Sequence, residues 1–81
     1  MNRNTYKAVA FERFTGKKIS TSAPFTTVVN VEKAAKELLH YSNVERVDVL
    51  KNGCLFEFFG KENGARHGLK VKDGKVTTVR L

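Results

Sequence analysis

Cysteine, proline and tryptophan are scarce in this sequence, whose 81 residues include one Cys, one Pro and no Trp. The single cysteine, Cys54, cannot form a disulfide within the chain, so we expect a reducing, cytoplasmic location and a small buried hydrophobic role for it. One cysteine and two histidines, His40 and His67, stand at no spacing that would make a zinc motif. We therefore expect neither a metal site nor a cofactor.

Long apolar stretches and catalytic motifs are also missing. The sequence has no run of about 18 apolar residues, the length that a membrane-spanning helix needs. Its N-terminal residues lack the apolar core of a signal peptide. No glycine-rich phosphate loop, Ser-His-Asp set or paired catalytic carboxylates can be assembled. These absences favour a protein that is neither a membrane protein nor an enzyme.

Basic residues are in excess, with 15 Lys and Arg against 8 Asp and Glu and a net charge of +7. The excess lies at the two ends of the sequence, because residues 1–21 and 61–81 each carry a net charge of +4 and residues 22–60 carry −1. Such a distribution favours contact with nucleic acid or with an acidic protein surface, and solubility alone is the alternative explanation.

Three dipeptides that end in glycine divide the second half of the chain: Asn52-Gly53, Asn63-Gly64 and Asp73-Gly74. Asn, Asp and Gly tolerate the positive φ that two-residue hairpin turns require. These turns predict a four-stranded meander, since two-residue connections force neighbouring strands to be antiparallel. Its strands are expected at residues 44–50, 54–59, 65–72 and 75–80.

The first half of the chain predicts a hairpin and a helix. Residues 5–14 are dense in aromatic and β-branched side chains and indicate a strand, with residues 18–22 as a short return strand. Asn30 can cap a helix over residues 31–42, whose apolar side chains follow a helical period. We expect this helix to cover one face of the sheet, which gives a single two-layer α+β domain over residues 1–81. How the hairpin joins the sheet stays open.

Two-residue turns would also decide which side chains share a face, because successive residues of a strand point to opposite faces. The face expected beneath the helix carries Val47, Val49, Phe56, Phe58, Leu69, Val71 and Val76. The opposite, outer face is expected to carry Arg46, Asp48, Leu50, Leu55, Glu57, Phe59, Lys70, Lys72, Lys75 and Val79. On that face, Glu57 and Lys70 would form a cross-strand ion pair.

The outer face is the binding surface that the sequence predicts. Its basic side chains, together with a basic cluster around the Asn63-Gly64 turn that includes His67, could hold phosphates or carboxylates. Phe59 would be the apolar anchor. The predicted binding residues are Arg46, Phe59, Lys61, Arg66, Lys70, Lys72 and Lys75.

Three interpretations of this outer face stay open. Clustered apolar side chains mark protein interfaces, so a protein partner or a homodimer is the first. The second is cover by the N-terminal hairpin of the same chain. The third is DNA or RNA binding, with lysines on phosphates and Phe59 as a stacking platform, although such platforms usually offer two or three adjacent aromatic rings.

An Asn-Gly turn followed by an aromatic run occupies residues 47–61. In layout, this segment and its surroundings resemble small phage-encoded inhibitors, including some anti-CRISPR proteins, which pair a short N-terminal hairpin and one helix with an antiparallel meander. The resemblance implies a small non-enzymatic inhibitor that docks on a host or foreign protein complex through a basic surface. A nucleic-acid-binding module that uses the same basic residues is the alternative function.

Overall fold

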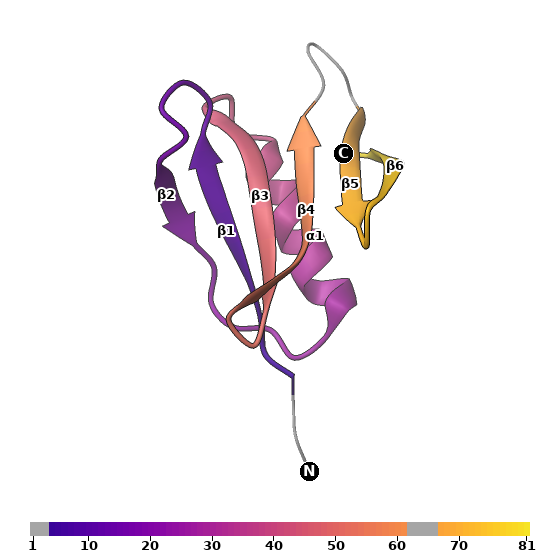
Figure 1. The fold of residues 1–81 in the computed structure, drawn as a ribbon. Coiled ribbons are helices and arrows are strands. Elements are labelled where there is room, and N and C mark those ends of the chain that lie inside the picture. Colours follow the sequence, from indigo (N-terminus) through magenta and orange to yellow (C-terminus); the bar gives the residue numbers. More distant parts are fainter. Residues whose placement is uncertain (1–3, 62–66) are drawn as a thin grey trace.

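The computed structural model describes residues 4–61 and 67–81, which form a six-stranded antiparallel sheet with an α-helix packed on one face (Figure 1). The elements in chain order are β1 (Tyr6–Glu12), β2 (Lys18–Thr21), α1 (Val28–Leu39), β3 (Val44–Lys51), β4 (Cys54–Lys61), β5 (His67–Lys72) and β6 (Lys75–Arg80). The two-layer α+β class predicted from the sequence is confirmed.

The strands lie side by side in the order β2-β1-β3-β4-β5-β6. Because β1 pairs with β3, the N-terminal hairpin extends the meander sideways and leaves both of its faces free of that hairpin. The interpretation in which the hairpin covers the outer face is therefore wrong. The short β2 and the C-terminal β6 form the two edges of the sheet.

Two of the three glycine-marked turns are confirmed. The φ angles are 52° and 85° at Asn52-Gly53, and 52° and 76° at Asp73-Gly74. A positive φ at both central residues gives the turn whose twist matches that of the flanking strands, which is why Asn or Asp followed by Gly is favoured there. The third predicted turn, Asn63-Gly64, lies outside the described residues.

α1 begins at Val28 and not at Val31, because Thr27 caps it in place of Asn30. The Thr27 hydroxyl oxygen accepts a hydrogen bond from the Asn30 backbone N–H at 3.3 Å, which satisfies one of the free donors of the first turn. The helix ends at Leu39. Its buried stripe belongs to one core cluster with β1, β3 and β4, composed of Tyr6, Ala8, Ala10, Val31, Ala35, Leu39, Val44, Val47, Val49 and Phe59.

A β-bulge in β4 overturns the predicted assignment of faces. The β3–β4 pairing starts as predicted, with Leu50 opposite Leu55, but the next pair joins Val49 to Glu57 and leaves Phe56 without a partner. An extra residue of this kind puts two successive side chains on the same side of a strand. Phe56 packs against the core as predicted, and the side chains that follow it face opposite to the prediction.

The expected position of Phe59 on the outer face is wrong for this reason. Phe59 pairs with Val47 beneath α1, and its side chain is 0% exposed. Phe58, which was expected beneath the helix, pairs with Asp48 on the other side of the sheet. Of the two adjacent phenylalanines, the helix therefore covers Phe59 and not Phe58.

The inversion continues through the last two strands. Phe58 lies opposite Val71 and not opposite Leu69, the partner that a two-residue turn would give it. The register between β4 and β5 is therefore displaced by two residues, and an even displacement does not change which residues of the two strands share a face. β5 and β6 pair as predicted, with Val71 opposite Val76. The residues that move from the predicted outer face to the helix side are Glu57, Phe59, Lys70, Lys72, Lys75 and Val79.

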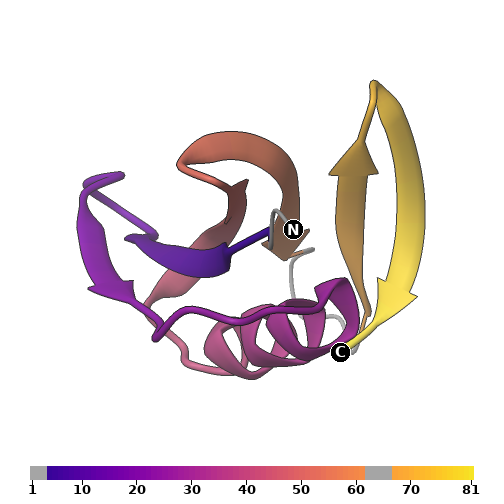
Figure 2. The same cartoon turned by 90° about the horizontal axis from the view of Figure 1, so that it is seen from below.

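The sheet is strongly twisted, and α1 crosses only its middle. In Figure 2, α1 lies beneath the central strands, while β2 on one side and the β5–β6 hairpin on the other point away from it. The helix contacts β1, β3 and β4. One face of the sheet therefore has a helix over its centre, and no described helix lies on the other.

Gly68 marks a close approach between β4 and β5. A Cβ atom at this position would lie 2.6 Å from the Gly60 backbone oxygen and 3.1 Å from the Leu81 side chain, whereas a Cβ at Gly60 would meet nothing within 4 Å. We expect Gly68→Ala to cost about 1–3 kcal/mol of unfolding free energy, because backbone must shift to make room. Gly60→Ala is the matched control and should cost less than about 0.5 kcal/mol in urea denaturation. Equal losses would contradict this packing.

Candidate functional site

The sheet face opposite α1, called the open face below, carries most of the apolar side chains that the helix does not cover. Its members come from β1, β3, β4, β5 and β6. They include the apolar residues Val9, Phe11, Leu50, Leu55, Phe58, Leu69, Val71 and Val76 and the charged residues Lys7, Arg46, Asp48 and Arg80. Leu55 and Val76 are the most exposed, and Val76 keeps 64% of its surface in water.

Arg46 and Phe58 form the centre of this face. The Arg46 guanidinium carbon lies 4.0 Å from the centroid of the Phe58 ring, and its Nε donates a hydrogen bond to Asp48 at 2.6 Å. A guanidinium stacked on an aromatic face is attracted by the ring, by about 0.5–1 kcal/mol at an exposed site. The pair thus places a charged, flat surface among apolar neighbours, which is an arrangement found at binding hot spots.

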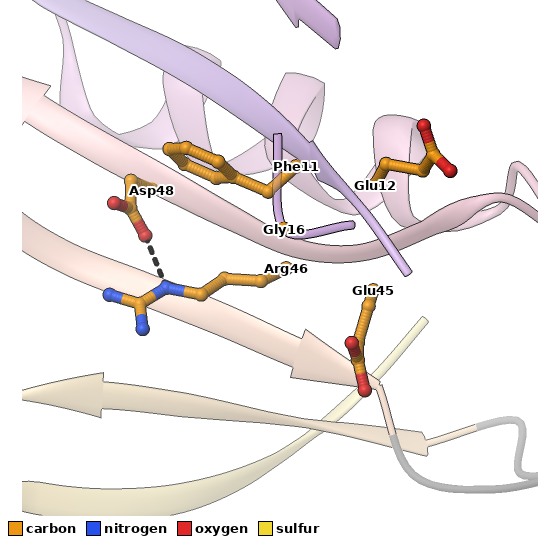
Figure 3. Close-up of a pocket in the computed structure, with 6 residues that line it drawn as sticks. All are labelled: Phe11, Glu12, Gly16, Glu45, Arg46 and Asp48. Carbon is orange, nitrogen blue, oxygen red and sulfur yellow. Dashed lines mark hydrogen bonds and ion pairs between the residues drawn. The ribbon is translucent and has the colours of Figure 1, made fainter. Parts of the chain in front are cut away.

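A recess of about 330 Å³ opens beside this centre, between the β1–β2 turn and the start of β3 (Figure 3). Glu12 and Glu45 lie at one end of it, and Asp48 and Arg46 at the other. Three carboxylates against one guanidinium make the recess acidic, so a basic side chain would fit it better than a phosphate or a carboxylate would. The lysines that the sequence placed on this face, Lys70, Lys72 and Lys75, lie on the other side of the sheet.

The predicted binding lysines lie on the helix side, and Lys70 there is already paired. Its Nζ donates to Glu32 of α1 at 3.1 Å and lies 4.0 Å from Glu57. The predicted ion pair between Glu57 and Lys70 therefore forms beneath the helix and not on an outer face. Lys70 thus links α1 to β5, and the two glutamates neutralise much of its charge.

Lys72 and Lys75 sit at the far end of the β5–β6 hairpin. The Lys72 ammonium lies 4.5 Å from the Phe56 ring centroid. Lys75 pairs with it across the strands and is exposed. Together with Lys70 and Asp73 they line a recess of about 320 Å³. Asp73 and the Glu32–Glu57 pair offset much of this positive charge.

Lys61, at the end of β4, is the remaining described residue of the predicted turn cluster. Its Nζ donates to the backbone oxygen of Tyr41 at 2.8 Å. Burial and the neighbouring Arg13 guanidinium lower the pKa of Lys61. Arg66, the other predicted cation of the cluster, lies outside the described residues.

Glu57 is buried beneath α1 with a titrating carboxyl group. Neither of its oxygens has a hydrogen-bond partner among the described residues. Burial first, and then the neighbouring Glu32, raise the pKa of Glu57 to about 7, although Lys70 and Lys72 oppose this. Burial would also raise the pKa of Glu32, but the neighbouring Glu57 carboxyl and the hydrogen-bonded Lys70 ammonium outweigh it and lower that pKa. At neutral pH Glu32 is therefore ionised and Glu57 is partly protonated, and both carboxyl groups face Lys70.

Within residues 4–61 and 67–81, no three His, Cys, Asp or Glu side chains lie close enough together to hold a metal ion. The helix found there lacks the length and the apolar character needed to cross a bilayer. Cys54, expected to be buried, is exposed at the tip of the β3–β4 hairpin beyond the core.

Sequence reasoning missed two exposed aromatic residues at one end of the sheet. Phe14 was expected inside a strand, but β1 ends at Glu12 and leaves the Phe14 ring 87% exposed in the β1–β2 turn. Tyr41 was expected inside the helix predicted over residues 31–42, but α1 ends at Leu39 and Tyr41 is 63% exposed. The turn signal Thr15-Gly16 could have placed Phe14 outside the strand.

Comparisons with protein-family models, with curated proteins and with solved structures find no match for this chain. The fold defines a two-layer α+β domain with a helix on one sheet face and an open apolar face on the other. A function must therefore be argued from these surfaces, because a fold by itself does not determine one.

Proposed function

We propose that this protein is a non-enzymatic binding protein that docks on another protein through its open face. The observation that carries the proposal is the apolar cluster of Phe58, Leu69, Val71 and Val76, which lies on the sheet face away from α1. Apolar side chains that cluster on an uncovered surface mark interaction sites, whereas single exposed apolar residues are ordinary.

The chemistry of the open face suggests what the partner presents. Apolar side chains of the partner would cover Phe58 and Val76, and a lysine or arginine would enter the acidic recess beside Arg46. A small inhibitor of the kind suggested by the resemblance would act in this way, by occupying the surface of its target. The exposed thiol of Cys54 supports a reducing, cytoplasmic location, since an oxidising compartment would modify it.

A non-enzymatic role is supported by the position of the strongly perturbed carboxyl group. Glu57 has the raised pKa expected of a catalytic acid, but its side chain is buried beneath α1, where a substrate would have to displace the helix. We therefore assign Glu57 and its neighbours Glu32 and Lys70 a structural role.

A matched pair of valines tests the proposal. Val76 on the open face and Val29 on α1 are 64% and 74% exposed, so a glutamate should be tolerated by the fold at either position. In quantitative affinity capture, Val76→Glu should lose the proteins that the unaltered chain enriches, with affinity reduced by about 30-fold. Val29→Glu should retain them.

Equal capture by both variants would contradict the proposal. A second copy of the chain is the other occupant to consider, and sedimentation equilibrium distinguishes it. A dimer that Val76→Glu converts to a monomer would assign the open face to self-association instead of a foreign partner.

A further inference from the structure

Two cations and two exposed aromatic rings meet at the end of the sheet where β1 and β4 finish. Arg13, Phe14, Tyr41 and Lys61, called the basic end below, come from the β1–β2 turn, the connection between α1 and β3, and the last residue of β4. Figure 1 shows these three places at the same end of the molecule, opposite the β3–β4 turn. None of the four residues belongs to the open face.

Contacts link the four residues into one surface. The Arg13 backbone N–H donates to the Asn43 carbonyl at 2.9 Å, which holds the turn against the α1–β3 connection. The Arg13 guanidinium lies 5.5 Å from the centroid of the Phe14 ring. On the other side, the Lys61 ammonium is held by the Tyr41 carbonyl at 2.8 Å. These contacts hold the β1–β2 turn, the α1–β3 connection and the end of β4 together, so the residues that carry the two rings and the two cations lie at one place.

The two cations are near enough to repel each other. Arg13 contributes, after burial, to the lowered pKa of Lys61. No carboxylate of residues 4–61 or 67–81 forms an ion pair with either of them. An anion bound between the two would relieve this repulsion and would be held by both.

The rings make the site more specific than a charge cluster. Phe14 is 87% exposed and Tyr41 is 63% exposed, so both rings offer surface to a ligand. Proteins bind single-stranded nucleic acid with exposed aromatic rings that lie beside cations. The bases stack on the rings, and the phosphates of the nucleic-acid backbone bind the cations. An acidic polypeptide would use the cations and leave the rings unused.

We propose that the basic end binds single-stranded nucleic acid, with phosphates on Arg13 and Lys61 and bases stacked on Phe14 and Tyr41. This site goes beyond docking on a protein and uses other residues, so either proposal can fail without the other. It also replaces the nucleic-acid surface that the sequence suggested, because the Phe59 platform of that surface is buried.

Fluorescence anisotropy with a labelled oligothymidylate of about 12 nucleotides tests the proposal, since single-strand sites span about 4–16 nucleotides. Binding by the unaltered chain should weaken as salt rises from about 50 to about 200 mM, with a log–log slope of about −1.4 for two phosphates. Phe14→Ala should weaken binding by about fivefold or more, the effect of losing one stacked base. Because the Phe14 ring is exposed, the substitution should leave the fold intact, and circular dichroism verifies this.

Charge controls separate a local site from the net charge of the chain. Arg13→Gln should reduce the salt slope by about 0.7. Lys75→Gln also removes one positive charge, but at the β5–β6 turn, away from the basic end, so it should leave the slope unchanged. Val76→Glu should bind the oligonucleotide through an unaltered basic end, whatever it does to protein capture.

Five results would overturn the proposal. Three are no binding at about 50 mM salt, equal binding by the Phe14→Ala variant, and equal slopes for Arg13→Gln and Lys75→Gln. The fourth is equal affinity for polyglutamate, which would show that the surface responds to negative charge and not to bases. The fifth is tighter binding of the matching duplex, whose base faces are hidden, because it would exclude the stacking role of the rings.

Discussion

Phe59→Ala is expected to lower the free energy of unfolding by about 3–5 kcal/mol, because it empties a fully buried position of the core. A domain of this size has a total stability of about 4–12 kcal/mol, so the variant should be largely unfolded or close to it. Urea denaturation followed by circular dichroism measures the loss. Where the variant does not fold at all, Phe59→Leu gives a smaller loss in the same direction.

The adjacent phenylalanine is the matched control. Phe58 lies on the open face, half-buried beneath the Arg46 guanidinium, and Phe58→Ala should cost only about 1–2 kcal/mol. The ratio between the two losses reports which ring faces the helix, without reference to any partner. A larger loss for Phe58→Ala than for Phe59→Ala would contradict the bulge at Phe56.

The stability of the protein is expected to fall as the pH rises from about 4.5 to about 7, through the buried Glu57 carboxyl. Its pKa is raised from 4.5 to about 7 in the folded chain, so in that interval the folded state holds a proton that the unfolded state has released. Stability from this group is complete below the lower value and lost by the upper one. The lowered pKa of Glu32 acts in the opposite direction, but mainly below about pH 4.5, so above that value we expect a net fall of about 1–3 kcal/mol.

Glu57→Gln should remove most of this dependence. A glutamine carries no charge to bury, so the variant should be more stable than the unaltered chain at about pH 8 and nearly independent of pH down to about pH 5. Glu37→Gln, at an exposed position of α1, is the control and should leave the pH profile as it was. A Glu57→Gln variant with an unchanged slope would show that another group causes the pH dependence.

Secondary structure was predictable from the sequence because local chemistry determines it. The turns at Asn52-Gly53 and Asp73-Gly74 follow from residues that tolerate positive φ, and the β5–β6 register follows from the second of them. The helix needed only its apolar period, although its start depended on whether Thr27 or Asn30 acted as the cap. Both residues are good caps, so the sequence could not decide between them.

The assignment of faces could not be predicted in the same way. Either phenylalanine of the Phe58-Phe59 pair can fill the core, and no glycine or proline marks the bulge at Phe56. What selects Phe59 is tertiary: its pairing with Val47 beneath α1 brings Lys70 to Glu32 on the same side. One extra residue then reverses every later side chain of the meander.

This reversal accounts for the predicted site as well. Arg46 precedes the bulge and was placed correctly on the face away from the helix, whereas Phe59, Lys70 and Lys72 follow it and were placed on the wrong side. Residues at element ends, such as Phe14 and Tyr41, were missed because strand and helix ends are the least certain part of a sequence-based assignment.

Nuclear Overhauser contacts between the two phenylalanine rings and α1 test the central feature of this account most directly. We predict contacts from the Phe59 ring to the methyl groups of Val31 and Leu39, and none from the Phe58 ring to α1. Contacts between Phe58 and the helix, with Phe59 open to solvent, would contradict the bulge and remove the open face on which the proposed docking depends.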